Sequence, residues 1–258
     1  MSRRSEYAPG VPCWVDLSST DVGASARFYE EVLGWRAETI DDPAAGGYGM
    51  FLHGDRKVAG LVPAMAGQPV STWDTFVATD DAEALADRVR QAGGTVAMKP
   101  TQVFEHGIVT VFRAPDGSFA AGWQAGDHPG AELVNEPVSF CWSELVTRDL
   151  PAAETFYPAV FGWDPRPLET PPGKYTEWHV GGHAVGGMLE MDPGYPAATP
   201  SFWMTYVAVA DLDATTAAAE RAGARMLVSG VDATPGRFSA FTDPHGATLS
   251  IIQLHEIS

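Results

Sequence analysis

Basic residues are scarce in this chain. Lysine and arginine number 16 against 33 aspartates and glutamates in 258 residues, which gives a formal net charge of −17 at pH 7. A surface this acidic repels nucleic-acid phosphates and anionic lipids, so neither a nucleic-acid partner nor a membrane partner is expected. Acidity also maintains solubility, and the sequence leaves open whether it has a further role in attracting cationic ligands.

Long apolar segments are absent as well. The sequence has no run of about 18 apolar residues that could span a bilayer. The first ten residues are polar and lack the apolar stretch of a secretory signal. We therefore expect a cytoplasmic protein.

Cysteine is rare, and common catalytic motifs are missing. Cys13 and Cys141 occupy matching places in the two halves of the chain. They could form a disulfide, but buried free thiols are the favoured interpretation. No Gly-x-Gly-x-x-Gly, Walker or Gly-x-Ser-x-Gly motif occurs, so nucleotide binding and serine hydrolysis have no support in the sequence.

The chain does contain a copy of itself. Residues 14–35 align with residues 142–163 without a gap, and nine of the 22 pairs are identical, where chance would give about one or two. Two further blocks match at similar offsets: 73–93 with 203–223, and 107–124 with 236–253. Three collinear matches indicate a duplicated domain.

The boundary between the copies falls where hydrophobic periodicity fails. Residues 126–137 carry Gly, Pro and charged residues without an apolar repeat, which is typical of a linker. We therefore predict a first domain at 8–125, this linker, and a second domain at 138–258. With 45% hydrophobic residues overall, each half can bury a core of its own.

Each half divides again into two similar units. Residues 11–17 favour a strand, Asp21 can cap a helix that Gly34 ends, and strands around 47–53 and 57–63 follow. The pattern recurs as a strand at 73–79 with a helix capped by Asp80 or Asp81, a strand at 139–146 with a helix at 151–161, a hairpin at 175–190, and a strand at 202–209 with a helix at 212–222. A unit of one strand, one helix and three strands therefore occurs four times.

This arrangement resembles the vicinal-oxygen-chelate superfamily of glyoxalases, bleomycin-resistance proteins and dioxygenases. The marks are a helix run and a closing turn in each half: Asp21, Phe28, Tyr29, Leu33, Gly34 and Trp35 with 114–117, then Asp149, Phe156, Tyr157, Phe161, Gly162 and Trp163 with 243–246. The resemblance implies an α+β fold of two tandem domains, each curling two βαβββ units into a cup with helices outside. The tandem form most resembles actinobacterial proteins labelled hydroxylases. All of these marks have structural roles, so they support the fold rather than an activity.

The resemblance also identifies where metal ligands would lie. Metal-using members carry a His or Gln seven residues before the capping Asp and a Glu seven residues after the start of the closing turn. The corresponding residues here are Trp14, Asp74 and Ala121 in the first half, and Trp142, Met204 and Ser250 in the second. Indole nitrogen is only a donor and alanine has no ligand atom, so we predict no metal and no cofactor. A shift of two residues keeps the same strand face and would bring in Asp16 and Glu144 instead.

Indoles at ligand positions predict an aromatic cup. The candidate ligand-binding residues are Trp14, Asp16, Trp73, Asp74, Trp123, Trp142, Glu144, Trp203 and Tyr206. Trp14 and Trp142 could equally be core residues, whereas Trp35 and Trp163 are predicted to be core. Tyr206 matches Phe76 in the first half, which suggests that the two cups differ.

The histidines do not form a ligand set. His179 and His183 are four residues apart, but Gly181 and Gly182 between them favour a hairpin that points them apart. The remaining histidines, expected in loops, turns, hairpins or the tail with surface roles, are His53, His106, His128, His245 and His255.

Two functions remain open at this point. The first is metal-independent binding of a small, planar aromatic or cationic molecule, through stacking and one acid in each cup. The second is an enzyme, namely a lyase, hydroxylase or oxygenase, that uses Asp16 or Glu144 as an acid–base group or as an atypical metal ligand. No catalytic residue is assigned. The halves are expected to pair within the chain, as a monomer or a homodimer.

Overall fold

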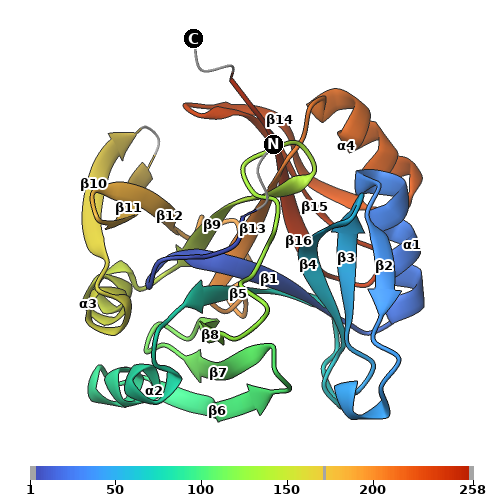
Figure 1. Ribbon diagram of the computed structural model, residues 1–258. Helices are drawn as coiled ribbons and strands as arrows, with labels where there is room; N and C mark the ends of the chain where they lie inside the picture. The colour runs from blue at the N-terminus through green and yellow to red at the C-terminus, as the bar shows by residue number, and fades with distance from the viewer. Residues whose placement is uncertain (1–3, 171–172, 256–258) are drawn as a thin grey trace.

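Two eight-stranded sheets form the protein, one from each half of the chain (Figure 1). The computed structural model describes residues 4–170 and 173–255, with side chains described for these residues except 169, 170, 173 and 174. The first sheet contains β1 (Pro12–Ser19), β2 (Arg36–Thr39), β3 (Gly49–His53), β4 (Arg56–Pro63), β5 (Thr72–Ala78), β6 (Thr95–Val103), β7 (Gly107–Arg113) and β8 (Phe119–Ala125). The second contains β9 (Ser139–Thr147), β10 (Asp164–Thr170), β11 (Gly173–Val180), β12 (His183–Glu190), β13 (Phe202–Ala208), β14 (Arg225–Ala233), β15 (Gly236–Thr242) and β16 (Thr248–Leu254).

The strand order shows two units within each sheet. The first sheet runs β2-β3-β4-β1-β5-β8-β7-β6, and the second repeats this order as β10-β11-β12-β9-β13-β16-β15-β14. Strand β1 lies parallel to β4 and antiparallel to β5, so the pairing of β1 with β5 joins the two units. This is the α+β architecture that the repeated strand–helix pattern predicts. The short edge strand β2 was not predicted, because its residues are mostly exposed and show no apolar alternation.

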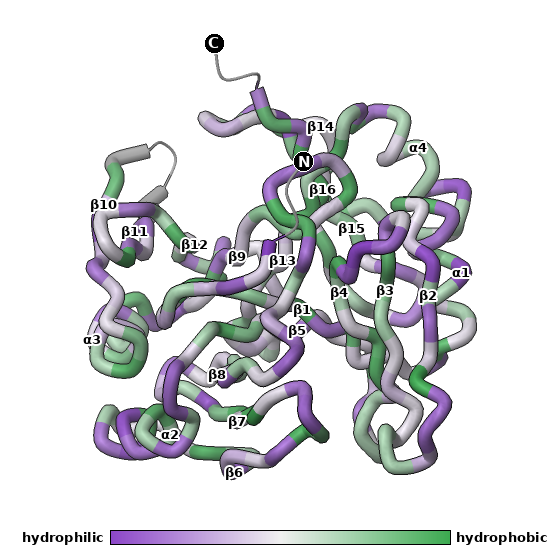
Figure 2. Tube along the Cα trace, viewed as in Figure 1, coloured by the Kyte–Doolittle hydropathy of each residue, from purple (hydrophilic) through white to green (hydrophobic). Residues whose placement is uncertain are grey.

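In the described part of the chain, four α-helices cover the outer faces of the sheets: α1 (Val22–Leu33), α2 (Ala82–Gln91), α3 (Leu150–Phe161) and α4 (Leu212–Arg221). The predicted caps of α1 are confirmed, since the Asp21 carboxylate accepts the Ala24 N–H and Gly34 adopts a left-handed φ of 68°. Asp81, rather than Asp80, caps α2. In Figure 2 the helices carry both hydrophobic and hydrophilic stretches, as expected for elements with one buried face. No helix in the described part of the chain is long and apolar enough to cross a membrane.

The two halves share their cores. Helix α1 packs against α4, and α2 packs against α3, as Figure 1 shows at opposite sides of the molecule. One hydrophobic cluster joins residues around Leu17 and Phe28 to Phe241 and Leu249 of the other half. A second cluster makes the reciprocal junction. The two halves therefore pair within the chain.

The aromatic residues that mark each helix hold this junction together. The Trp35 indole N–H donates to the Val138 carbonyl at 2.8 Å, and the Trp163 indole N–H donates to the Gly10 carbonyl at 2.6 Å. Each bond runs from one half to a residue one or two positions before the first strand of the other half. Both indoles are buried, as predicted for core residues. Cys13 and Cys141 carry free thiols.

Candidate functional site

Strand alternation decides which residues face into each cup. On β1, Val15 and Leu17 enter the core beneath the helices, whereas Trp14 belongs to a separate cluster on the other face of the first sheet. Asp16 lies two residues from Trp14 and shares its face. Trp142 has the same place on β9, and its strand register opposes Tyr206 on β13.

In the first cup, an indole and a phenol hold a buried acid. The Trp14 N–H donates to Asp16 Oδ1 at 2.5 Å, and the Tyr48 hydroxyl donates to the same oxygen at 2.9 Å. The Trp14 nitrogen also lies 3.2 Å from the Tyr48 oxygen. Burial raises the pKa of Asp16 to about 6, although the bonds from Tyr48 and Trp14 oppose this shift.

A second acid faces Asp16 across the strand pair. Asp16 and Asp74 are direct partners in the antiparallel register of β1 and β5, so their side chains project from the same face. Burial, and then the nearby negative charge of Asp16, raise the pKa of Asp74 to about 7. The first cup therefore contains two neighbouring carboxyl groups.

The second cup repeats the unit with different neighbours. The Trp142 N–H donates to the Tyr175 hydroxyl at 3.0 Å, and the Tyr206 hydroxyl donates to Glu144 Oε2 at 2.8 Å. Burial raises the pKa of Glu144, against hydrogen bonds from Tyr206 and Tyr175. Met204 opposes Glu144 where Asp74 opposes Asp16, so this cup has a single acid at its floor.

A glycine beneath each unit makes room for the tyrosine. A Cβ atom added at Gly60 would overlap Asp16 and Tyr48, and one added at Gly187 would overlap the Tyr175 hydroxyl. Both glycines lie on the strand that pairs with the acid-bearing strand, each directly opposite the acid. Absence of a side chain at these positions is therefore required for the phenol to approach the acid.

Replacing Gly187 with alanine is expected to displace the Tyr175 hydroxyl and to lower the free energy of unfolding by about 1–3 kcal/mol through overpacking. Urea denaturation followed by circular dichroism measures this change. Gly23→Ala is the control, because a Cβ atom at that helical position meets its neighbours at ordinary distances of 3.6 and 3.7 Å. If Gly187→Ala has the same free energy of unfolding as the parent protein, the steric role assigned to Gly187 is wrong.

Two predicted residues lie outside the cups. Trp73 and Trp203 project from the helix-facing side of β5 and β13, where their indole N–H groups donate to Tyr29 and Tyr157, each at 3.0 Å. Both are buried in the shared cores. The prediction that they contribute to the cup is wrong, because residues 73 and 203 alternate with the inward-facing residues 74 and 204.

The linker packs over the first cup. The His128 ring contacts Trp14 edge-on with centroids 4.6 Å apart, and the Trp123 indole N–H donates to the His128 carbonyl at 2.9 Å. Burial lowers the pKa of His128 to about 4. His128 was expected to have a surface role in a loop, but its exposed fraction is only 4%. The His128 ring is buried because it packs against the indoles of Trp14 and Trp123.

Tyr48 and Tyr175 were missed by the sequence analysis. They lie 127 residues apart, close to the offsets of the matching blocks, but outside any of those blocks. Gly60 and Gly187 show the same offset. A comparison of the two halves between the aligned blocks would have identified all four residues.

Comparison with known proteins agrees with this architecture. The model of the Glyoxalase/Bleomycin resistance protein/Dioxygenase superfamily matches residues 13–119 and again residues 139–251. The chain belongs to this superfamily. The anthracycline biosynthesis protein DnrV of Streptomyces peucetius is 37% identical over 266 aligned positions, covering 98% of this chain and 96% of that protein.

Solved structures of superfamily members share the fold. The Mn(II)-bound glyoxalase of Novosphingobium aromaticivorans matches with a TM-score of 0.67 at 19% identity, covering 100% of this chain and 85% of that one. The 2,2',3-trihydroxybiphenyl 1,2-dioxygenase of Sphingomonas wittichii strain RW1 matches with a TM-score of 0.66 at 14% identity, covering 96% and 92%. At these identities the likeness concerns the fold alone.

The residues of this superfamily member do not fit a divalent metal. Among the residues that the structure describes, no group of three or more His, Cys, Asp or Glu side chains is placed to hold an ion. The first cup offers Asp16 and Asp74, and the second offers Glu144 alone. Protein sites for catalytic metals use about three side-chain ligands. The indole N–H groups of Trp14 and Trp142, which lie beside these acids or the neighbouring tyrosines, are hydrogen-bond donors and cannot act as metal ligands.

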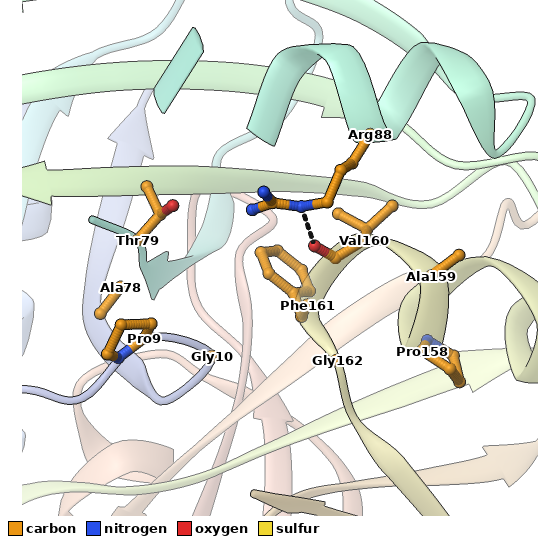
Figure 3. Close-up of a pocket in the computed structure, with 10 residues that line it drawn as sticks. All are labelled: Pro9, Gly10, Ala78, Thr79, Arg88, Pro158, Ala159, Val160, Phe161 and Gly162. Carbon is orange, nitrogen blue, oxygen red and sulfur yellow. Dashed lines mark hydrogen bonds between the residues drawn. The ribbon is translucent and has the colours of Figure 1, made fainter. Parts of the chain in front are cut away.

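A separate groove lies between the halves (Figure 3). It has a volume of about 300 Å³ and is bordered by Pro9, Gly10, Arg88 and the end of α3. The Arg88 Nε–H donates to the Val160 carbonyl at 2.9 Å. A cation at the C-terminal end of a helix is stabilising, so Arg88 has a structural role at this junction.

Proposed function

We propose that the protein binds a small, planar aromatic molecule in the cup of a superfamily domain, without a metal ion. The observation that carries this proposal is the unit of indole, phenol and buried acid that stands in each cup where metal-using relatives place ligands. An indole wall supplies stacking worth about 0.5–1.5 kcal/mol beyond its buried area. The acid and the hydroxyls supply a few directed polar contacts, which is the usual composition of a small-molecule site.

The names of the relatives favour the same class of guest. DnrV is named as an anthracycline biosynthesis protein, and a second such protein, DauV of a Streptomyces strain, is 36% identical over 98% of this chain. Anthracyclines are planar polycyclic aromatic compounds. The two proteins match this chain over 96% of their own length, so the comparison includes both cups.

Titration of the protein with a panel of planar aromatic compounds is expected to quench tryptophan fluorescence saturably, with a Kd in the micromolar range or about −8 kcal/mol. Quenching should be unchanged after dialysis against a chelator, and the compound should be recovered intact. If no compound in the panel quenches the fluorescence, or if quenching requires added divalent metal, the proposal is wrong.

Acid–base catalysis on the bound molecule is a second candidate, favoured by one observation. A carboxyl group with a pKa near neutrality can both accept and donate a proton, and the pKa of Asp74 is raised to about 7. Incubation of the protein with an excess of each bound compound, followed by mass spectrometry, tests this candidate. Conversion of more than one equivalent, lost in Asp74→Asn, would establish turnover in the first cup.

A further inference from the structure

We infer that the second cup takes the guest, one molecule per chain, and that the guest presents a neutral hydroxyl group to Glu144 with a hydrogen-bond acceptor beside it. The inference rests on the proposed function, because it assumes that a planar guest binds in one of the cups. It assigns the site and the functional groups of that guest.

The indole of the first cup is covered by its own chain. Trp14 is only 3% exposed, and its cluster includes Ala131 and Tyr7 from the segments that flank the first domain. The Ala131 N–H donates to the Cys13 carbonyl at 2.8 Å, and the Glu132 N–H donates to the Lys57 carbonyl at 2.8 Å. The linker is therefore bonded to both β1 and β4, upstream of the point where these strands pair with each other.

The second cup leaves its indole more accessible than the first. Trp142 is half-buried, whereas Trp14 at the equivalent position is covered. The remaining aromatic residues do not distinguish the cups, since Tyr48 and Phe76 are half-buried like Tyr175 and Tyr206. Within the described ranges, no aromatic ring packs against Trp142 as His128 packs against Trp14. The Trp142 indole is therefore the more accessible of the two for a planar guest.

The floor of the second cup has unused hydrogen-bonding capacity. Glu144 is 7% exposed and receives hydrogen bonds from Tyr206 and Tyr175. A carboxylate has about four acceptor positions, so two remain for a donor from a guest. An ammonium guest carries three N–H donors and would turn one of them toward the Met204 thioether, which is a weak acceptor, whereas the single donor of a hydroxyl is satisfied by Glu144 alone. A neutral hydroxyl is therefore the better fit.

Ser250 supplies the second part of the recognition. Its side chain is 1% exposed, and no described residue meets its hydroxyl with hydrogen-bond geometry, although Tyr206 lies beside it. A buried hydroxyl without a partner costs about 1–3 kcal/mol. Ser250 pairs in register with Tyr206, which itself bonds to Glu144. A carbonyl on the neighbouring ring of the guest, too far from the hydroxyl to bond with it internally, would accept a hydrogen bond from Ser250 while the hydroxyl donates to Glu144.

Isothermal titration with 2-hydroxyanthraquinone, whose hydroxyl cannot bond internally to a ring carbonyl, and with anthraquinone lacking the hydroxyl, tests the assignment. The parent protein is expected to bind one equivalent of the hydroxylated compound, about tenfold more tightly than the unsubstituted one. Glu144→Gln should remove most of this preference, and Ser250→Ala should weaken both compounds about fivefold. Trp142→Phe should weaken both further, because it reduces the stacking surface.

The equivalent variants of the first cup, Trp14→Phe and Asp16→Asn, give the opposite test. The inference predicts affinities within about twofold of the parent protein for both. Two equivalents bound, or loss of binding in these variants and not in Glu144→Gln, would overturn the assignment while leaving the proposed function in place. Equal affinity for the two compounds would overturn the assignment of a hydroxyl group to the guest. Absence of binding to the parent protein by any planar compound would instead overturn the proposed function.

Discussion

Tyr29→Phe is expected to lower the free energy of unfolding by about 3 kcal/mol, because it leaves two buried polar groups without partners. The Tyr29 hydroxyl accepts the Trp73 indole N–H at 3.0 Å and donates to Asp243 Oδ2 at 3.1 Å. Tyr29 belongs to the first half and Asp243 to the second. Asp243 is only 4% exposed, so its carboxylate oxygen has no easy access to water in the variant.

Tyr157→Phe is the matched control, and a smaller loss of about 1–2 kcal/mol is expected. The Tyr157 hydroxyl accepts the Trp203 N–H at 3.0 Å and lies 2.7 Å from Ser118 Oγ. Ser118 keeps a second partner, Asp116 Oδ1 at 2.6 Å, so its hydroxyl remains bonded in the variant. Urea denaturation of both variants measures the difference. Equal losses, or a larger loss for Tyr157→Phe, would contradict the importance of the buried carboxylate.

These bonds explain why the family marks are retained in both halves. The Phe-Tyr pair of each helix meets the closing turn of the opposite half, or the residue after it, at the junction. In the first core Tyr29 bonds to Asp243, and in the second Tyr157 bonds to Ser118, which directly follows the turn at 114–117. The marks therefore stabilise the pairing of the two domains. They contain no information about the guest, because neither tyrosine lies in a cup.

The fold was predictable because its signals are local and occur twice. A capping carboxylate, a terminal glycine and an apolar helix face each depend on a few neighbouring residues, and Asp21 and Asp149 show them at equivalent positions. Duplication made the boundaries visible, because matching blocks with nearly constant offset do not require any knowledge of the sheet. The strand order could then be taken from the family resemblance.

The site was only partly predictable, because its contacts depend on strand register. The inward-facing positions of β1 and β9 followed from counting, and the structure brings Trp14 together with Asp16. The opposition of Asp16 and Asp74 required the pairing of β1 with β5, which no local pattern specifies. Tyr48 reaches the cup through a gap left by Gly60 on a neighbouring strand, and such a gap is visible only once the strands are paired.

The opposed acids of the first cup have a consequence for stability. The pKa of Asp74 rises to about 7 and that of Asp16 to about 6, against 3.8 in each case for an unperturbed carboxyl. The folded protein therefore holds more protons than the unfolded chain between about pH 4 and pH 7. Stability falls as pH rises through this window, because deprotonation is easier in the unfolded state.

Asp74→Asn is expected to remove most of this loss, so that the variant is more stable than the parent protein at pH 8 and similar to it at pH 4. A shift of about three pKa units corresponds to roughly 4 kcal/mol, and the partial exposure of the Asp74 side chain reduces the expected gain to about 2 kcal/mol. Urea denaturation at half-unit steps from pH 4 to pH 8.5 measures the difference between the two curves.

Asp80→Asn is the control for the change in net charge, since Asp80 is exposed just beyond the end of the same strand. Its stability should follow that of the parent protein across the whole range. A constant offset between Asp74→Asn and the parent protein would show that the two acids do not titrate in this window. A gain that grows from about pH 4 to about pH 7 and stays constant above pH 7 would show that the folded protein keeps the Asp74 carboxyl protonated up to near neutrality.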